Sequence, residues 1–379
     1  MGTLSESAGR EDRVTEASLL TPHAPGLECI DRGILTSRRW MIIMLCLAGA
    51  SVMAVIGCLQ FGAEEISFSD GARILVQALR EGHAGIESAG PAGIILVHVR
   101  LPRVLLAFLV GGCLAAVGVA LQALLRNPLA DPYVLGISSG AALGASVAML
   151  LGLGATVLAF SALPLFAFAG GLLSILVVYR IAVAYGRLPV HTLLLAGVIL
   201  NAIFSALIMF ITSIMDPNRS FGMMAWLMGA IIAPEYPSLA ALALYIAAGG
   251  LVLFKHARSL DVLTLGEESA RALGVEVEGL KRIVFVISAL LTGAVVSVSG
   301  LIGFVGMVIP HAVRMVLGAD HRLLLPASAL VGGMFLTVAD AVARTALAPG
   351  EIPVGVVTAL AGGPFFIYLL ARRKGGFAI

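Results

Sequence analysis

The amino-acid sequence predicts an all-α membrane protein, a polytopic bundle of about ten transmembrane helices with both termini in the cytoplasm. Three observations lead to this fold class. Hydrophobic residues make up 59% of the 379 residues and charged residues only 12%, whereas a soluble domain carries about 25% charged residues. The apolar residues gather in runs of roughly 20, the length that crosses a bilayer. Lys and Arg recur between alternate runs, which orients the bundle.

The chain divides into a tail, a membrane domain and a short end. Residues 1–39 form a polar N-terminal tail of mixed charge, which we expect to be disordered. The tail is not an ordinary signal peptide, because the first apolar run begins only at Trp40 and is as long as a span. Residues 40–374 form the ten-helix domain, and 375–379 a C-terminal tail. The expected spans are residues 40–60, 101–125, 133–153, 159–181, 192–213, 238–254, 283–299, 301–317, 323–347 and 353–371.

The orientation of these spans follows from the positive-inside rule. Arg38 and Arg39 precede the first span. The longest loop expected on the same side of the membrane, residues 255–282, carries further Lys and Arg. Arg372 and its neighbours follow the last span. An even number of spans places all these groups on one side, so both ends of the chain are expected in the cytoplasm.

Three arginines break this pattern, because they fall on the outer side. Arg100 and Arg103 flank Pro102 at the expected start of the second span, where the positive end of a helix dipole disfavours cations. Arg344 lies toward the outer end of the ninth span, four residues after Asp340, and the two can pair on one helix face. Snorkelling to lipid phosphates is one explanation for such arginines.

Two inner segments carry recognisable helix signals. In the stretch from 126 to 140, Asp131 can cap the next helix, with Pro132 at its first position. In the 255–282 loop, Thr264 and Glu267 fit a capping box, and a short helix is expected to follow and to end at Gly274. Taken alone, this short helix is equally consistent with a docking element and with an ordinary surface helix.

Small residues and cysteines indicate packing rather than chemistry. Gly136, Gly140 and Gly144 recur every four residues and predict a ridge on which another helix packs closely. The four cysteines are scattered and form no CxxC pair, so we interpret them as small apolar side chains and not as a disulfide framework or a metal site.

Several functions are disfavoured by what the sequence lacks. It has no GxxxxGK[ST] phosphate-binding loop, no basic run interleaved with aromatic residues for nucleic acid, and no catalytic or metal-ligating constellation. An intramembrane enzyme is therefore unsupported, and sparse ionisable residues in the spans argue against a stand-alone secondary transporter. Asn201, Ser205 and Thr212 lie roughly on one face of the fifth span, which suits a passive lining.

Several longer motifs, in this order along the chain, resemble the FecCD family, the membrane permeases of type II ABC importers for iron–siderophores, haem and cobalamin. The resemblance covers residues from about 40 to 374. It rests on RLPRVLLAFLVGG, ALLRNPLADPYVLGISSGAALGA, LLLAGVILNAIFSA, MAWLMGAI, LGEESARALGV, GLIGFVGMVIPHAVR, DHRLLLPASALVGG and EIPVGVVTALAGGPFFIYLL.

The resemblance implies a multi-pass subunit of the bacterial cytoplasmic (inner) membrane. It would pair with a second permease, as a homodimer or a heterodimer, and be driven by two cytoplasmic ABC ATPase subunits. A substrate-binding protein, periplasmic or lipid-anchored, would deliver the ligand, and the chain would bind no cofactor or metal of its own. An iron–siderophore is the leading substrate, with cobalamin or haem as the alternative.

The resemblance also assigns residues. The 255–282 loop becomes a coupling loop that docks on the ATPase through Leu265, Gly266, Glu267, Ala270, Arg271, Leu273 and Gly274. Docking of the binding protein falls on Arg100, Arg103 and Arg344. The pathway at the dimer interface would be lined by span five and the start of span ten, with a gate and lining at Pro189, Val190, His191, Asn201, Ser205 and Thr212. Pro189 and His191 stand where relatives commonly carry small hydroxyl residues.

Overall fold

A computed structural model describes residues 36–62, 67–82, 88–153, 156–157, 160–183 and 188–373, and within the chain Ser37–Ile379 forms one compact unit. Most of the expected N-terminal tail, residues 1–35, and the whole C-terminal tail, residues 375–379, lie outside the described residues. The first described helix begins at Ser37, so the predicted tail of residues 1–39 is slightly too long at its C-terminal end.

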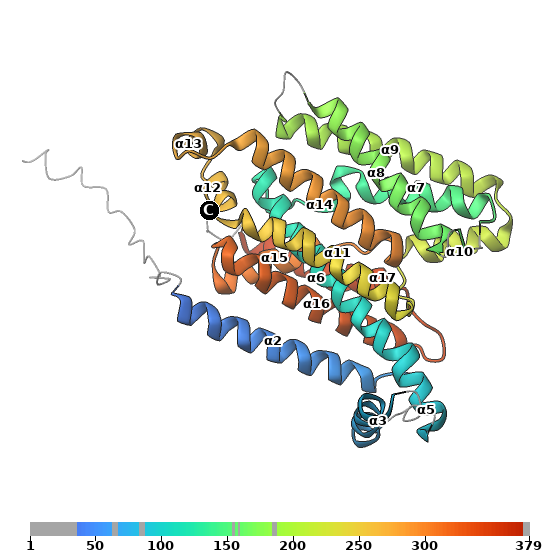
Figure 1. Ribbon diagram of the computed structural model, residues 1–379. Helices are drawn as coiled ribbons and strands as arrows, with labels where there is room; N and C mark the ends of the chain where they lie inside the picture. The colour runs from blue at the N-terminus through green and yellow to red at the C-terminus, as the bar shows by residue number, and fades with distance from the viewer. Residues whose placement is uncertain are drawn as a thin grey trace, which may run out of the picture. The chain divides into compact units, whose positions relative to one another are not determined.

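The described elements are helices apart from one short hairpin (Figure 1). In chain order the first are α2 (Ser37–Gln60), α3 (Phe68–Glu81), α5 (Gly90–Ile94), the π-helix η1 (Ile95–Arg100), α6 (Leu101–Leu125), the 3-10 helix η2 (Pro132–Leu135), α7 (Ile137–Leu150) and the antiparallel strands β1 (Thr156–Val157) and β2 (Phe160–Ser161). There follow α8 (Ala162–Ala182), α9 (Val190–Ile214), α10 (Pro217–Leu227), α11 (Tyr236–Lys255), α12 (Ala257–Thr264), α13 (Glu267–Ala272), α14 (Val277–Ser299), α15 (Val305–Leu317), α16 (His321–Thr345) and α17 (Val354–Arg373).

The described helices agree with a membrane bundle. Seven of them are long and apolar enough to cross a bilayer, and three shorter apolar helices, α7, α15 and α17, coincide with the remaining expected spans. The count of ten crossings and the cytoplasmic position of both termini stay predictions.

The second span is longer than expected. Helix runs without a break from Gly90 to Leu125, 36 residues, so Pro102 lies inside it and does not begin it. Proline removes one helical hydrogen bond and clashes with the carbonyl four residues earlier. The wider turns of η1, directly before it, relieve that clash. Arg100 and Arg103 therefore do not face a helix N-terminus, and the expected dipole penalty does not arise.

The seventh and eighth spans are separated by a real break. Helix α14 ends at Ser299 and α15 begins at Val305, with Gly300 and Phe304 in positive-φ conformations at 64° and 69°. A phenylalanine rarely adopts that backbone region. Because of the break, α15 is short and begins inside the bundle. Its start lies against the middle of α6, where Gly118 meets the main chain of Gly306.

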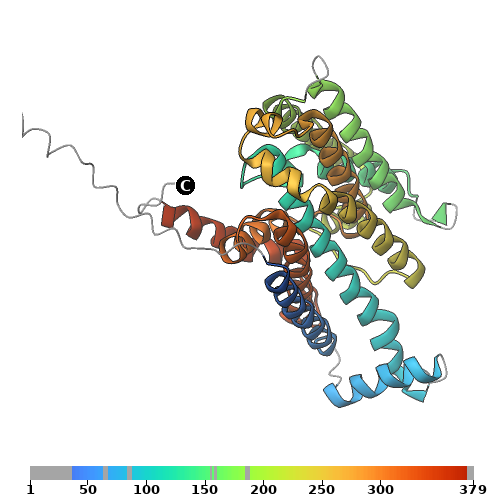
Figure 2. The same cartoon turned by 60° about the vertical axis from the view of Figure 1, so that its left-hand side comes forward.

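The core is built around α6, the long teal helix in Figure 2, which packs most extensively on α16 and also contacts α14 and α15. Glycines permit this closeness. A Cβ added to Gly332 would lie 2.6 Å from the carbonyl oxygen of Gly111, and one added to Gly140 would lie 2.7 Å from that of Gly170 on α8. An added Cβ would also meet the carbonyl oxygen of Phe166 on α8 at Gly144, and that of Gly197 on α9 at Gly136. The predicted ridge of Gly136, Gly140 and Gly144 is thereby confirmed as a packing surface, facing α8 at two positions and α9 at the first.

The cysteines follow the expectation only in part. Cys58 and Cys113 are buried as free thiols, but Cys46 is exposed on α2. Helix α2 packs on α16 and α6 along one side only, and most of its surface faces away from the bundle. An exposed apolar surface of this kind is what a lipid-facing helix presents.

Candidate functional site

One group of charges lies at the end of the bundle that the positive-inside rule assigns to the outside. We call Arg100, Arg103, Asp340, Arg344 and Glu351 the outer charge cluster. Asp340 is fully buried and is paired with two arginines: its Oδ1 lies 3.0 Å from Arg103 Nη2, and its Oδ2 lies 3.0 Å from Arg344 Nε. The expected pairing of Asp340 with Arg344 on one face of a helix is confirmed.

Two arginines of the outer charge cluster hold the end of α2. Arg344 donates through Nη1 to the carbonyl of Phe61 at 2.9 Å, and Arg100 donates through Nη1 to the carbonyl of Leu59 at 3.1 Å. The last carbonyls of a helix have no partner inside it, so guanidinium groups satisfy them well. Arg100 and Arg344 are only 4% and 6% exposed, and they act within the chain as a clamp on α2.

Arg103 is the member of the three arginines that faces outward. Its guanidinium holds Asp340 on one side and Glu351 on the other, and Glu351 is about half exposed, at 54% of its side chain. Glu351 belongs to the short connection that leads into α17. The structure thus brings the three predicted docking residues together and leaves Arg103 nearest the surface.

The predicted coupling segment forms the short helix α13 at the opposite end of the bundle (Figure 1). Gly266 begins it at a φ of 122°, and Gly274 follows it at 82°. The expected capping box is wrong, because Thr264 ends α12 and its hydroxyl donates to the carbonyl of Asp261. Glycine at 266 tolerates the unusual backbone that turns the chain from one short helix into the next.

The surface of α13 is mixed. Ala270 is fully buried, whereas Leu265 and Leu273 at its two ends are 69% and 65% exposed. The helix therefore presents exposed apolar side chains at both ends, with the charged side chains of Glu268 and Arg271 exposed between them.

A second group of charges lies beneath α13. We call Glu267, Arg271, Glu278 and Lys281 the inner charge cluster. Lys281 Nζ lies 3.1 Å from both Glu267 Oε1 and Glu278 Oε1, and Arg271 lies 3.3 Å from Glu267 Oε2. Lys281 also donates to the carbonyl of Leu188 at 3.0 Å, which connects the cluster to the start of α9.

The predicted gate and lining residues lie along α9. Pro189 precedes the helix at its N-cap, Val190 is its first residue and His191 is exposed. Asn201, Ser205 and Thr212 share one face, since their positions differ by no more than about 40° around the helix. Ser205 is exposed and Asn201 half-buried, whereas the hydroxyl of Thr212 donates to the carbonyl of Ile208. The first two therefore offer polar groups to whatever covers this face.

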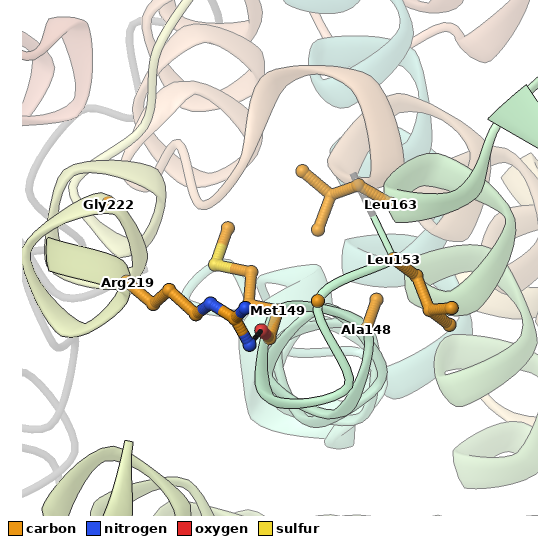
Figure 3. Close-up of a pocket in the computed structure, with 7 residues that line it drawn as sticks. Ala148, Met149, Leu153, Leu163, Arg219 and Gly222 are labelled. Carbon is orange, nitrogen blue, oxygen red and sulfur yellow. Dashed lines mark hydrogen bonds between the residues drawn. The ribbon is translucent and has the colours of Figure 1, made fainter. Parts of the chain in front are cut away.

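A hollow of about 350 Å³ lies beside the end of α7 (Figure 3). Arg219 reaches across from α10, and its Nη1 donates to the carbonyls of Leu150 at 3.0 Å and Met149 at 3.4 Å. Met149, Leu153 and Leu163 supply apolar walls. The guanidinium completes the C-terminus of α7 and fixes α10 against it.

The turn between α6 and α7 is buried in the bundle. Asp131 is 8% exposed, and its Oδ1 accepts from the backbone N–H of Tyr133 at 2.9 Å. The expected cap is confirmed, although it caps η2 and not the membrane helix itself. Burial raises the pKa of Asp131 to about 6, against a smaller opposing effect of the Tyr133 N–H.

Sequence reasoning missed Lys281 and Glu278 as site residues and counted Lys281 only as a positive charge of an inner loop. Their spacing of three residues on one helix face was the available signal. Their contact with Leu188, which lies 90 positions before Glu278 and 93 before Lys281, could not be predicted from any local sequence pattern.

Comparison with known proteins decides the family. Residues 45–372 match the FecCD transport family, which is most of the chain. The chain belongs to the FecCD family. Among its relatives, the cobalamin import system permease protein of Halobacterium salinarum is 45% identical over 75% of each chain. The hemin transport system permease protein of Yersinia pestis is 42% identical over 74% of this chain and 84% of its own.

Solved structures agree with this membership of the FecCD family. A metal-chelate type ABC transporter in an inward-facing conformation matches with a TM-score of 0.73 and 31% identity, over 88% of this chain and 99% of that one. The predicted family and the ABC permease architecture are therefore confirmed.

Proposed function

We propose that this chain is the membrane permease of an ATP-driven importer that takes up a metal chelate through alternating access at a permease dimer interface. The observation that carries the proposal is the FecCD match across residues 45–372. The chain itself has no phosphate-binding loop, so two cytoplasmic ABC ATPase subunits would supply the energy. The importer would sit in the cytoplasmic membrane, with both ends of the chain inside.

An iron–siderophore is the leading substrate. Two Helicobacter pylori relatives named as iron chelatin permeases are 35% identical over 87% of this chain and 98% of their own length. Cobalamin is the alternative, favoured by the 45% identity to the Halobacterium salinarum protein, and haem follows from the Yersinia pestis relative. All three are metals held inside a large organic chelator, so one wide pathway suits them.

The docking assignments are part of this proposal. Leu265 and Leu273 would enter the partner ATPase, because their exposed side chains supply apolar area that binding would bury. Arg103 would meet a carboxylate of the substrate-binding protein. Arg100 and Arg344 would contribute by positioning the end of α2, since their own donors are used there.

The experiment is reconstitution of the permease with its ATPase subunits and its substrate-binding protein in liposomes. We expect ATP hydrolysis to rise with one loaded binding protein, and the same chelate to accumulate inside. An iron–siderophore, cobalamin and haem are tested in parallel, each with the catalytic glutamate of the ATPase replaced as a control. Uptake by the permease alone, without ATP, would instead show a stand-alone secondary transporter.

A further inference from the structure

Lys281 lies where three segments of the chain meet. Its side chain is 2% exposed, and Nζ lies 3.0 Å from the carbonyl oxygen of Leu188 and 3.1 Å from Glu267 Oε1 and Glu278 Oε1. Glu267 opens α13, and Glu278 and Lys281 share the first turns of α14. Leu188 directly precedes the N-cap of α9. One ammonium group thus connects the starts of three helices.

Leu188 is held by both of its main-chain polar groups. Its N–H donates to Glu278 Oε2 at 2.8 Å, and its carbonyl accepts from Lys281. The leucine side chain itself is 1% exposed. A residue held at its N–H, carbonyl and side chain is restrained relative to α14, so the entry to α9 is coupled to the start of α14.

The buried lysine is fully satisfied. An ammonium group has three donors, and three oxygens surround this one. Taking a charge out of water is costly, and a buried ion pair is often no more stabilising than apolar residues of the same volume. Breaking such a pair, in contrast, is strongly unfavourable. The arrangement therefore resists separation of its three segments more than it adds to overall stability.

Helix α13 packs on α12 and α14, and among the described residues few of its side chains bind the rest of the bundle. It is six residues long, and of its side chains only Ala270 is buried. Arg271 adds a longer contact of 3.5 Å to Glu278. The pairing of Glu267 with Lys281 is thus the main polar connection from α13 to the body of the bundle.

We propose that Lys281 is the positioning residue through which displacement of α13 reaches the inner end of α9. The inference rests on the proposed function, in which an ATPase binds and moves α13. A displaced Glu267 draws Lys281 with it, because the alternative leaves one of the three donors of a buried ammonium without its partner. Lys281 and Glu278 then carry Leu188, and with it the first turn of the helix assigned to the pathway.

The test measures the movement of α13 and of α9 separately in the complex of permease and ATPase. Spin labels are placed in pairs at Glu268 and Val316, and at Leu195 and Val316. Glu268 is exposed on α13, Leu195 is 61% exposed on α9, and Val316 is 77% exposed on α15, which packs on α6 and α16. The labelled chains carry alanine at Cys29, Cys46, Cys58 and Cys113. Distances are recorded by pulsed electron resonance with and without Mg-ATP and vanadate.

With Lys281 present, both distances should change when nucleotide is trapped. In Lys281→Met, the change between 268 and 316 should persist, while the change between 195 and 316 should be lost. Lys281→Arg, which keeps the charge, should restore part of it. Lys255→Met is the matched control, because Lys255 is an exposed lysine at the end of α11, and both changes should remain.

Each other outcome contradicts a defined part of the proposal. If both distances still change in Lys281→Met, Lys281 does not transmit the movement. If both changes disappear, Lys281 only holds α13 in place for docking, and the relay is wrong. If neither distance responds in the unsubstituted chain, the proposed function fails first. Should Lys281→Met not fold, Glu278→Gln weakens the same connection at a partly exposed side chain. The 268–316 distance should then still change, and the change in the 195–316 distance should be reduced.

Discussion

The guanidinium of Arg103 binds Glu351 in a two-pronged contact, Nη1 to Oε1 at 3.0 Å and Nη2 to Oε2 at 2.9 Å. Such paired bonds are the geometry by which arginine recognises a carboxylate. Glu351 thus occupies the outward edge of Arg103, which is the edge that a carboxylate of a docking protein would use. The two would compete for one guanidinium.

Glu351→Gln should therefore strengthen docking of the substrate-binding protein. The exposed pair contributes at most about 1 kcal/mol, so we expect the affinity to rise by a factor of about 2 to 5. Binding is measured by interferometry on the permease complex in nanodiscs. Asp70→Asn removes a carboxylate that is half exposed elsewhere on the same side and should leave the affinity unchanged. Equal or weaker binding by Glu351→Gln would show that the two carboxylates do not compete.

Arg344→Met should destabilise the fold. The substitution leaves the buried Asp340 with Arg103 alone and removes a donor from the end of α2. Loss of one partner from a buried ion pair costs on the order of 3 kcal/mol, and denaturant unfolding in detergent measures it. The double variant Asp340→Asn with Arg344→Met should recover part of the loss. Arg73→Met, at an exposed arginine of α3, should stay within about 0.5 kcal/mol.

Gly144→Ala should weaken the contact between α7 and α8. The new methyl group would meet the carbonyl of Phe166 and lie 3.2 Å from Ala167 Cα. Overpacking of this kind costs about 1–3 kcal/mol, and the melting temperature of the purified permease should fall. Gly250→Ala is the matched control, because nothing lies within 4 Å of its added methyl group, and helix propensity should raise stability there by about 0.5–1 kcal/mol. A similar fall in both variants would contradict the close packing of α7 on α8.

The stability of the permease should depend on pH through Asp131. The folded-state pKa is about 6, above the ordinary value of 3.8, so the folded chain binds more protons between these values. Stability should then fall as the pH rises from 3.8 to about 6 and stay lower above it. Asp131→Asn should remove this contribution, which melting curves at pH 5 and pH 7 would detect. A parallel pH profile in the variant would show that Asp131 is not the group responsible.

Much of the fold could be predicted from the sequence because the bilayer imposes its own pattern. Apolar runs of span length located most membrane helices to within a few residues, as at α9 and α16. The errors came where tertiary contacts override local signals. The sequence predicts a helix start at Pro102, but η1 lets the helix pass through it. It also predicts a cap at Thr264, but Gly266 begins α13.

The candidate site was predictable in its residue types and less so in its contacts. The position of Arg100, Arg103 and Arg344 at one end of the bundle could be inferred from span counting, and the pairing of Asp340 with Arg344 from their spacing. Their burial could not, because it depends on where α2 ends relative to α6 and α16. The same holds for the contact of Lys281 with Leu188, which joins distant parts of the chain.

The glycine contacts that bring α6 against α15 and α16 have a mechanical consequence. Main chain approaches main chain at Gly118 with Gly306 and at Gly111 with Gly332, which leaves little room for α6 to slide along α15 or α16. Helix α17 packs on α15 and α16, whereas α9 packs on α7, α8 and α10. A movement of α9 therefore need not break the glycine contacts of α6.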